Sequence, residues 1–352
     1  MARIALDAMG GDFAPRATVH GALLALAELE REHTLQLVGQ TAVVESTIDE
    51  LLAGEMAAHA ALRDRLAIVE APDVITMTDK PTVALRGKPQ SSMVVGLRLQ
   101  AEGKSDAFVS AGNTGAQMAA SAFVLGRHEG LARPAIGTLF PTARKPVVVL
   151  DSGANVDSSA EELVQFARIG TVYAEDMLGR PNPTVGLLSI GEEPEKGNAA
   201  VKEAHQLLLA SGLNFLGNVE GRDIPVGQCD RGPIDVVVCD GFVGNVLLKF
   251  YESIAPTLMG MFAKALGAER AALEEAFREL DYSDHGGAPL LGVKGVSIIS
   301  HGKSSPRAIK NACRVAARAV ESRMSEHVGR RLSEASASAA ASAAAPSESP
   351  RA

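Results

Sequence analysis

The chain has 352 residues, of which 46% are apolar and 22% charged, with a formal net charge of −8 and a pI near 5.6. A general nucleic-acid binder needs a basic face, so this balance argues against that class. Trp is absent and aromatic residues make up only 4% of the chain. Small aliphatic side chains must therefore fill the core, which suits parallel strands buried on both faces.

Neither targeting nor redox features stand out. Cys229, Cys239 and Cys313 have no paired or metal-ligand spacing, so we expect apolar filler in a reduced compartment, with no metal and no cofactor. The N-terminus turns polar too early for a signal peptide, and no apolar run approaches the roughly 18 to 20 residues of a spanning helix. We expect a cytoplasmic protein.

Short aliphatic runs alternate with segments of helical periodicity such as Ala17–Glu30, Ser92–Ala101 and Ala199–Ala210. This alternation predicts an α/β fold with a mostly parallel sheet and helices on both faces, in one compact catalytic unit over residues 1–332. The predicted strands are Arg3–Ala8, Thr34–Gly39, Leu66–Ala71, Asp106–Ala111, Pro134–Phe140, Pro146–Asp151, Thr184–Ile190, Asp235–Asp240 and Val296–Ser300.

Two segments near the C-terminus have their own patterns. Apolar stripes at helical spacing predict a projecting helical hairpin over about residues 246–281. Core or dimer packing is the usual meaning of such a stripe, and weak contact with a bilayer is the alternative. From Ser333 to Ala352 nearly all residues are Ser or Ala, which predicts a disordered tail. The membrane or dimer contacts of the hairpin are Leu258, Met261, Phe262 and Leu266.

Six glycine-containing turns with polar side chains follow the predicted strands. The carboxyl ends of parallel strands line a ligand crevice, and glycine amides and helix N-termini suit an anion. Phosphate, free or within a nucleotide, is the expected ligand. The turns are Asp7–Asp12, Ser110–Gly115, Asp151–Asn155, Ser189–Asn198, Asp240–Asn245 and Ser300–Ser304.

Each turn also has a purely structural interpretation. A glycine after a strand is often a tight turn, and Asn or Asp before a helix is often an N-cap. Asp151 and Asp240 could hold loop amides, Lys196 could be a solvated lysine among glutamates, and His301 could be structural. The occurrence of six such turns together favours a binding site.

Several common site motifs are absent. The sequence has no G-x-G-x-x-G fingerprint, no complete Walker motif and no G-x-S-x-G elbow. These absences argue against a standard NAD enzyme, a P-loop NTPase and a serine acyltransferase.

The turns resemble the bacterial phosphate acyltransferases (acyl-carrier-protein:phosphate transacylases) of phospholipid synthesis. The resemblance implies a homodimeric enzyme, related in fold to phosphotransacetylases and isocitrate-dehydrogenase-like proteins, that moves a long-chain fatty acyl group from acyl carrier protein to inorganic phosphate. The acyl phosphate then feeds a membrane glycerol-3-phosphate acyltransferase. The matching stretches are Asp7–Pro15, Ser110–Ala116, Asp151–Val156, Ser189–Asn198, Cys239–Lys249 and Gly287–Ser304.

In such a reaction phosphate attacks the thioester directly, so no enzyme nucleophile is required. The expected catalytic residues are Asn245 as oxyanion donor, Lys196 as charge compensator, His301 at the phosphate or the leaving thiolate, and Asp240 as an orienting group. The expected phosphate-binding residues are Gly10, Gly11, Asp12, Asn113, Thr114, Gly115, Asp151, Asn155, Gly197, Asn198, Gly241, Gly244 and Lys303.

Three alternatives stay open at this point. The same pocket would serve a short-chain phosphotransacetylase acting on acetyl-coenzyme A. A non-catalytic membrane scaffold for lipid enzymes would need the hairpin but not the glycine turns. An NAD(P)-dependent decarboxylating dehydrogenase should show carboxylate clusters for a metal, which the sequence lacks.

Overall fold

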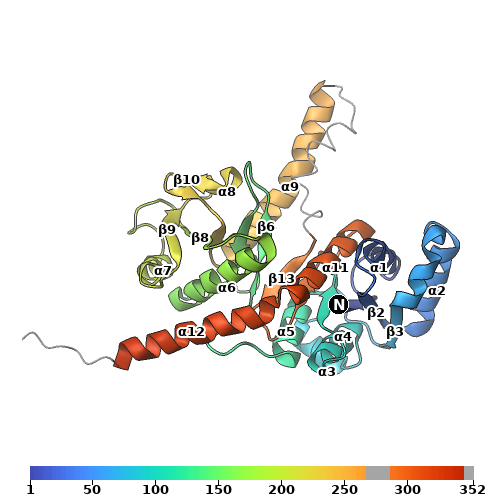
Figure 1. The fold of residues 1–352 in the computed structure, drawn as a ribbon. Helices are drawn as coiled ribbons and strands as arrows, with labels where there is room; N and C mark the ends of the chain where they lie inside the picture. The colour runs from blue at the N-terminus through green and yellow to red at the C-terminus, as the bar shows by residue number, and fades with distance from the viewer. Residues whose placement is uncertain (267–285, 345–352) are drawn as a thin grey trace, which may run out of the picture.

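The computed structural model describes residues 1–266 and 286–344. Its strands form two main sheets, one of seven strands and one of five, with helices packed around both (Figure 1). The predicted α/β class with mostly parallel strands is confirmed. The single sheet expected from the sequence is instead divided in two, and this division separates the predicted turns into two groups.

The first sheet has the strand order β3-β2-β1-β4-β14-β13-β5. The run from β3 to β14 is parallel, and β13 and β5 pair antiparallel at one end. The ends of β1, β4 and β14 are therefore neighbours. The strands are β1 (Arg3–Asp7), β2 (Thr34–Gly39), β3 (Leu66–Glu70), β4 (Ala107–Ser110), β5 (Ala135–Ile136), β13 (Ala288–Leu291) and β14 (Ser297–Ile299).

The second sheet has the order β6-β7-β12-β8-β9, parallel except for β6 at its edge. The ends of β7, β12 and β8 are neighbours here. The strands are β6 (Thr138–Phe140), β7 (Val147–Leu150), β8 (Thr184–Leu188), β9 (Asn214–Val219) and β12 (Val236–Val238), and a separate pair is formed by β10 (Gln228–Cys229) and β11 (Gly232–Pro233).

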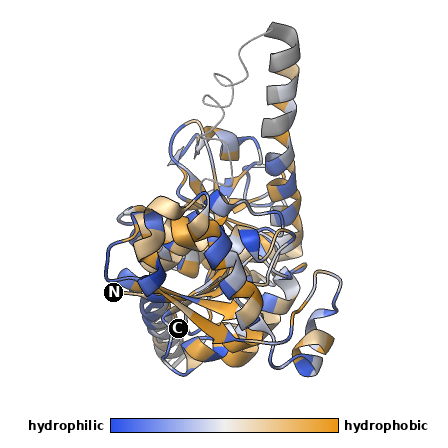
Figure 2. Cartoon of the chain, turned by 90° about the vertical axis from the view of Figure 1, so that its right-hand side faces the viewer, coloured by the Kyte–Doolittle hydropathy of each residue, from blue (hydrophilic) through white to orange (hydrophobic). Residues whose placement is uncertain are grey.

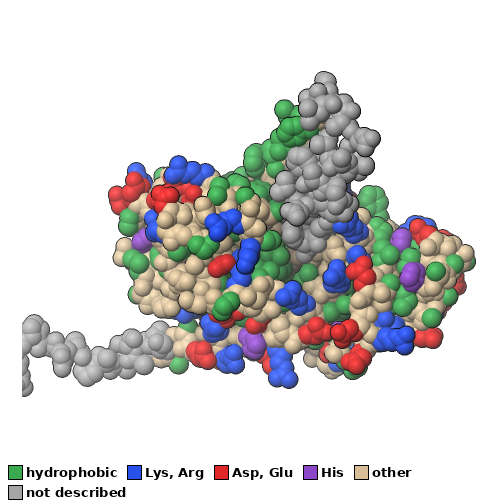
Figure 3. Space-filling model, turned by 45° about the horizontal axis from the view of Figure 1, so that its top comes forward, with side chains coloured by type: hydrophobic (Ala, Val, Ile, Leu, Met, Phe, Trp, Pro, Cys, Tyr) green, Lys and Arg blue, Asp and Glu red, His purple; other side chains and the backbone are tan. Residues whose placement is uncertain are grey.

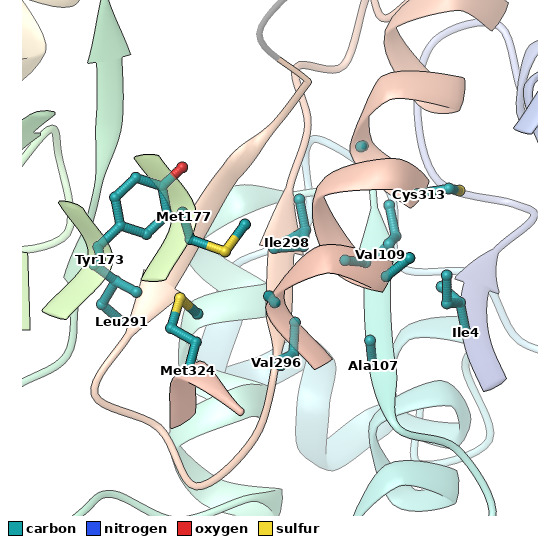
Figure 4. Close-up of a cluster of buried hydrophobic side chains, with 14 of the residues drawn as sticks. Ile4, Ala107, Val109, Tyr173, Met177, Leu291, Val296, Ile298, Cys313 and Met324 are labelled. Atoms are coloured by element: carbon teal, nitrogen blue, oxygen red, sulfur yellow. The ribbon is translucent and has the colours of Figure 1, made fainter. Parts of the chain in front are cut away.

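One buried cluster joins the two sheets. It contains Ile4 and Val109 from the first sheet, Leu150 and Val236 from the second, and Phe166 between them. Figure 4 shows part of this cluster, and Figure 2 shows apolar strands in the interior with helices of mixed polar and apolar residues around them. The helices are α1 (Arg16–Glu28), α2 (Thr41–Ala53), α3 (Pro81–Gly87), α4 (Ser92–Ala101), α5 (Thr114–Val124), α6 (Ala160–Leu178), α7 (Ala199–Leu209), α8 (Asp223–Val226), α9 (Gly241–Leu266), α11 (Pro306–Glu321) and α12 (Met324–Ala344), with a 3-10 helix η1 (Ala57–Arg65).

The predicted strand Pro134–Phe140 is in fact two strands in different sheets. Ile136 pairs with Leu290 in the first sheet, whereas Thr138 pairs with Val149 in the second. The break falls at Gly137, where an added Cβ would lie 3.1 Å from the side chain of Leu291. Glycine therefore lets the chain pass closely between the sheets.

Helix α12 continues to Ala344, through part of the segment from Ser333 for which the sequence predicts a disordered tail. The first turns of α12 bury Val328 and Leu332, and His327 and Arg331 contact acidic residues of α6 at 2.8 and 2.6 Å. These contacts supply the helix nucleus, and alanine has the highest propensity to extend it. Residues 345–352 lie outside the described part.

Helix α9 projects from the body (Figure 1) and forms the first arm of the predicted hairpin. The second stripe, with Leu273, Phe277 and Leu280, lies outside the described residues, so the hairpin stays a prediction. In the single chain Met261 is 63% exposed and Phe262 is 42% exposed, and Figure 3 shows apolar side chains along the projecting helix. No helix among the described residues is long and apolar enough to cross a membrane.

Candidate active site

The three loops of the first sheet are joined by hydrogen bonds around a buried carboxylate. Asp7, the last residue of β1, accepts a hydrogen bond from the Met9 amide at 3.1 Å and one from the Ser110 hydroxyl at 2.7 Å. Burial raises the pKa of Asp7, and the hydrogen bonds it accepts oppose that shift. The Asp12 amide donates to the Gly302 carbonyl at 2.7 Å. The ends of β1, β4 and β14 therefore form one connected surface.

Glycines allow this surface to be compact. A Cβ at Gly10 would lie 2.5 Å from the Asp7 carboxylate and 2.9 Å from the Gly112 nitrogen. Gly11 has a φ of +109°, a conformation that strains other residues. Both glycines are needed to fold the loop back over Asp7, with Asp12 beside the β14 loop.

Asn113 has both ends of its side-chain amide bound within the protein. Its Oδ1 accepts from the Ala116 amide at 3.0 Å and so caps α5, which begins at Thr114. Its Nδ2 lies within 3.1 to 3.3 Å of the carbonyls of Thr76, Met77 and Asp79. A Cβ at Gly115 would come within 2.9 Å of Pro81. This turn holds the 76–81 segment in place, and the N-cap interpretation of Asn113 is supported.

His301 and Lys303 are exposed at the end of β14. The Lys303 amide donates a hydrogen bond to His301 Nδ1 at 3.1 Å. In the neutral imidazole the remaining proton is therefore on Nε2. That N–H and the Lys303 ammonium make no hydrogen bond or ion pair within the described part of the chain, so both are available to a ligand.

Asp151 is the buried carboxylate of the second sheet. Its oxygens accept from the amides of Gly153, Ala154 and Asn155 at 3.2, 3.0 and 2.6 Å, and from the Ile136 amide at 3.0 Å. Burial raises its pKa, against the effect of these hydrogen bonds. Asp151 therefore holds loop amides, as its structural interpretation expected. Because Ile136 is in β5, this carboxylate also connects the end of β7 in the second sheet to the edge strand of the first sheet.

The first turn of α9 lies directly against the Asp151 loop. The Gly241 amide donates to the Asn155 carbonyl at 2.7 Å, while the Asn155 side chain donates to Asp151 and to Pro134, both at 2.9 Å. A Cβ at Gly241 would lie 2.7 Å from the Asp151 carboxylate, and one at Gly244 would overlap the Asp151 carbonyl oxygen. These two glycines let α9 begin in contact with that loop.

Asp240 and Asn245 lie on the same turn but in different surroundings. The Asp240 carboxylate accepts from the Val243 amide at 2.9 Å and so caps the start of α9. Asn245 is exposed, and its side chain lies beside Gly153, where an added Cβ would be 3.4 Å from Oδ1. The Asn245 amide is thus presented to solvent at the end of β12.

The loop after β8 carries an exposed lysine. The Lys196 stem lies over Gly191, where an added Cβ would be 2.9 Å from Lys196 Cγ. Among the described residues its ammonium makes no ion pair, whereas neighbouring Glu192 lies 3.4 and 3.5 Å from two arginines. Gly197 has a φ of +106°, and Asn198 caps α7 through the Val201 amide at 2.9 Å. The loop therefore presents a free cation next to a helix N-terminus.

Comparison with known proteins fits this arrangement. A family model described as fatty acid synthesis protein matches residues 2–327. A phosphate acyltransferase of Desulforamulus reducens is 49% identical over 91% of this chain and 94% of its own, and one of Desulfitobacterium hafniense is 47% identical over 94% and 98%. The chain belongs to the phosphate acyltransferase family. The family resemblance read from the turns is confirmed.

Solved structures place the family fold among the phosphotransacetylases. A Streptococcus pyogenes phosphotransacetylase aligns with a TM-score of 0.60 at 16% identity, covering 91% of this chain and 94% of its own. A branched-chain phosphotransacylase of Enterococcus faecalis aligns at 0.57 and 14%, covering 91% and 99%. At these identities the likeness shows the fold alone.

Four polar residues at the strand ends were not among the site residues predicted from the sequence. Asp7 and Ser110 bond to each other, and the hydroxyls of Ser189 and Ser300 are buried without a hydrogen-bond partner in the described structure. Each is the first residue of one of the glycine turns. Its position at the end of a strand is the signal that could have identified it.

One cluster has the composition of a metal site but not its chemistry. Glu30, His33 and Glu321 lie close together, away from the strand-end loops. His33 Nδ1 accepts from the Ala2 amide at 3.2 Å, so the neutral ring carries its proton on Nε2, which faces Glu321 at 3.0 Å. Both ring nitrogens are occupied, and the imidazole has no lone pair left for a metal.

Proposed function

We propose that this protein transfers a long-chain fatty acyl group from the thioester of acyl carrier protein to inorganic phosphate. The observation that carries the proposal is near-full-length identity of up to 49% to proteins named phosphate acyltransferase. The products would be an acyl phosphate and free carrier protein. The strand-end loops support it because they offer free cations and amides but no activated nucleophile of the protein.

The proposed reaction is a direct displacement. A phosphate oxygen attacks the thioester carbonyl carbon, and the tetrahedral oxyanion collapses with cleavage of the carbon–sulfur bond. The sulfur leaves with the bonding electron pair as a thiolate. The His301 Nε2–H, left free by the bond between Nδ1 and the Lys303 amide, can protonate it or orient the phosphate.

The proposed binding site uses both sheet edges. Lys196 and the glycine amides of its loop would hold phosphate, and the exposed Asn245 amide would donate to the developing oxyanion. His301 and Lys303 would complete the site from the first sheet. Asn113, Asp151, Asp240 and Asn198 accept hydrogen bonds from loop or helix amides, so they would support the site rather than touch phosphate. Asn155, whose side chain donates to Asp151 and to the Pro134 carbonyl, would have the same supporting role.

The decisive experiment offers purified protein a long-chain acyl carrier protein with and without inorganic phosphate. We expect thiol release only with phosphate, together with an acyl phosphate trapped by hydroxylamine. Activity with acetyl-coenzyme A but not with the acyl carrier protein would instead favour a short-chain phosphotransacetylase. No activity with either donor would favour the non-catalytic scaffold function.

We also propose a homodimer that works in the cytoplasm and makes weak contact with the membrane. The exposed residues Met261 and Phe262 of α9, with Leu258 and Leu266, would form the dimer or membrane contact. Such contact would bring the acyl phosphate to a membrane glycerol-3-phosphate acyltransferase. Vesicle flotation at low and high salt tests its strength: Phe262→Asp should abolish flotation, and strong flotation of the unaltered protein in high salt would contradict a weak contact.

A further inference from the structure

A buried histidine and asparagine form a hydrogen-bonded pair beneath the Lys196 loop. His205 in α7 is 4% exposed and Asn218 in β9 is fully buried. His205 Nδ1 lies 2.9 Å from Asn218 Oδ1, and since the amide oxygen only accepts, the imidazole is the donor. The other end of the amide, Nδ2, donates to the Glu193 carbonyl at 2.8 Å. The histidine thus fixes which way the amide faces.

The Glu193 carbonyl is also the one that closes the turn bearing Lys196. The Lys196 amide donates to it at 3.0 Å, so this oxygen receives one hydrogen bond from the core and one from the loop itself. Buried polar groups cost free energy unless they are paired, and a paired network fixes a single arrangement. Asn218 therefore connects the rigid strand to the backbone of the lysine.

Two further contacts hold the same loop. Arg231 donates to the Asn218 carbonyl and lies 3.5 Å from the Glu192 carboxylate, so it spans from β9 to the loop. Gly191 is not among the glycines with a positive φ, but an added Cβ there would lie only 2.9 Å from Lys196 Cγ, so glycine leaves room for the lysine stem. The loop is fixed at its carbonyl, at its acidic side chain and along the lysine stem.

We infer that Asn218 and His205 are positioning residues that set where the Lys196 ammonium stands. The inference rests on the proposed function, in which Lys196 binds phosphate. An exposed lysine has many rotamers, and its backbone must be fixed if the ammonium is to meet a phosphate at low entropic cost. The buried pair fixes that backbone from within the core without touching substrate.

The test measures the KM for phosphate and kcat in single and double variants. Asn218→Asp keeps the acceptor for His205 but places an oxygen against the Glu193 carbonyl. We expect the phosphate KM to rise about tenfold, the scale of one lost buried hydrogen bond, with a smaller change in kcat. His205→Leu should have the same effect, whereas His205→Asn, whose amide nitrogen can replace Nδ1, should restore most of the affinity.

A double-variant cycle separates this inference from the proposed function. If Asn218 acts through Lys196, Asn218→Asp should raise the phosphate KM in the parent but not further in Lys196→Ala. Additive effects, or a normal KM in both Asn218→Asp and His205→Leu, would overturn the inference while leaving the role of Lys196 intact. A normal phosphate KM in Lys196→Ala would refute that role, and the inference with it.

A matched control lies on the same strand. Asn214 donates to the Asn182 carbonyl at 3.1 Å, at the opposite end of β9 from the Lys196 loop. Asn214→Ala removes an asparagine-to-carbonyl bond of the same strand that is exposed, and it should leave the phosphate KM unchanged. Equal KM increases in this control and in Asn218→Asp would mean that general loosening of β9 explains both. Should Asn218→Asp fail to fold, His205→Leu and His205→Asn carry the comparison.

Discussion

Asn245, at the start of α9, is exposed and is the proposed donor to the oxyanion. Its amide borders Gly153 at the sheet edge and contributes little to the packed core. We predict that Asn245→Ala lowers kcat by about 10²- to 10³-fold, the usual cost of losing an oxyanion donor. The melting temperature should stay close to that of the unaltered protein. Rates and thermal melts on one preparation check this, and an unchanged kcat would remove Asn245 from the proposed mechanism.

The buried carboxyl of Asp7 should make the free energy of unfolding depend on pH. Burial raises its pKa in the folded state, so the folded protein binds more protons than the unfolded chain between the unfolded pKa, about 3.9, and the raised value. The contribution of this group to the free energy of unfolding therefore falls as pH rises through that window. Asp7→Asn removes the titration.

Urea unfolding of Asp7→Asn and the unaltered protein from pH 4 to 7 provides the measurement. The difference in unfolding free energy, unaltered minus variant, should decline with rising pH and then level off. Because other groups titrate alike in both proteins, their contributions cancel. A difference that grows with pH would mean that the hydrogen bonds from Ser110 and Met9 outweigh desolvation.

At the scale of elements, α9 contains a matched pair of glycines. A Cβ at Gly244 would overlap the Asp151 carbonyl oxygen, whereas one at Gly260 would meet nothing within 4 Å. We predict that Gly244→Ala lowers the free energy of unfolding by about 1–3 kcal/mol and disrupts the Asp151 loop. Gly260→Ala should be neutral or stabilising by about 0.5–1 kcal/mol. Chemical denaturation distinguishes them, and equal effects would show that helix propensity alone governs both sites.

Helix α12 also divides into two parts. Leu332 is buried, whereas Ser333, Glu334 and Ser336 just beyond it are exposed. We predict that Leu332→Ala costs about 2–5 kcal/mol, as buried leucines commonly do. Truncation after Ala337 should reduce helical circular dichroism without lowering the melting temperature. A large loss of stability on truncation would show that the Ser/Ala segment packs against a partner.

The strands could be predicted from the sequence where aliphatic runs are continuous. β2 occupies the predicted Thr34–Gly39, and the ends of β1, β7 and β14 differ by only a residue or two. β9 was missed because Gly217, with a φ of +96°, interrupts its aliphatic pattern at a bulge. β13 contains Pro289 and pairs antiparallel, so it carries no parallel-strand signal.

The candidate site could be predicted in part for the same reason. The position of the polar turns at the strand ends could be predicted from the strands alone. Which of their side chains remain free could not be predicted, because that depends on contacts between residues far apart in the sequence. The amide of Asn113, for example, is taken up by carbonyls 34 to 37 residues away. The division of the turns between two sheets could not be predicted either, because it depends on where the chain crosses between the sheets, at Gly137 and again between β12 and β13.

At the scale of the whole molecule, the shared core predicts that both sheets unfold together. Phe166 of α6 is fully buried in the cluster that joins them. We predict that Phe166→Ala costs about 3–5 kcal/mol and preserves a single unfolding transition. Buried cysteines report on each half: Cys313 in α11 beside the first sheet, and Cys239 at the end of β12. Thiol labelling in urea should show one midpoint for both, and separate midpoints would contradict a common core.

The position of β14 between β4 and β13 has a consequence for how the protein is made. β4 ends at Ser110, but its partner β14 does not begin until Ser297, after the entire second sheet has been synthesised. A nascent chain that has already formed β1 to β4 therefore exposes an unpaired central strand while more than half of the polypeptide is still to come. Such an edge invites pairing with other chains. Slow or interrupted translation in the last quarter of the message should accordingly yield aggregates rather than a partly active fragment.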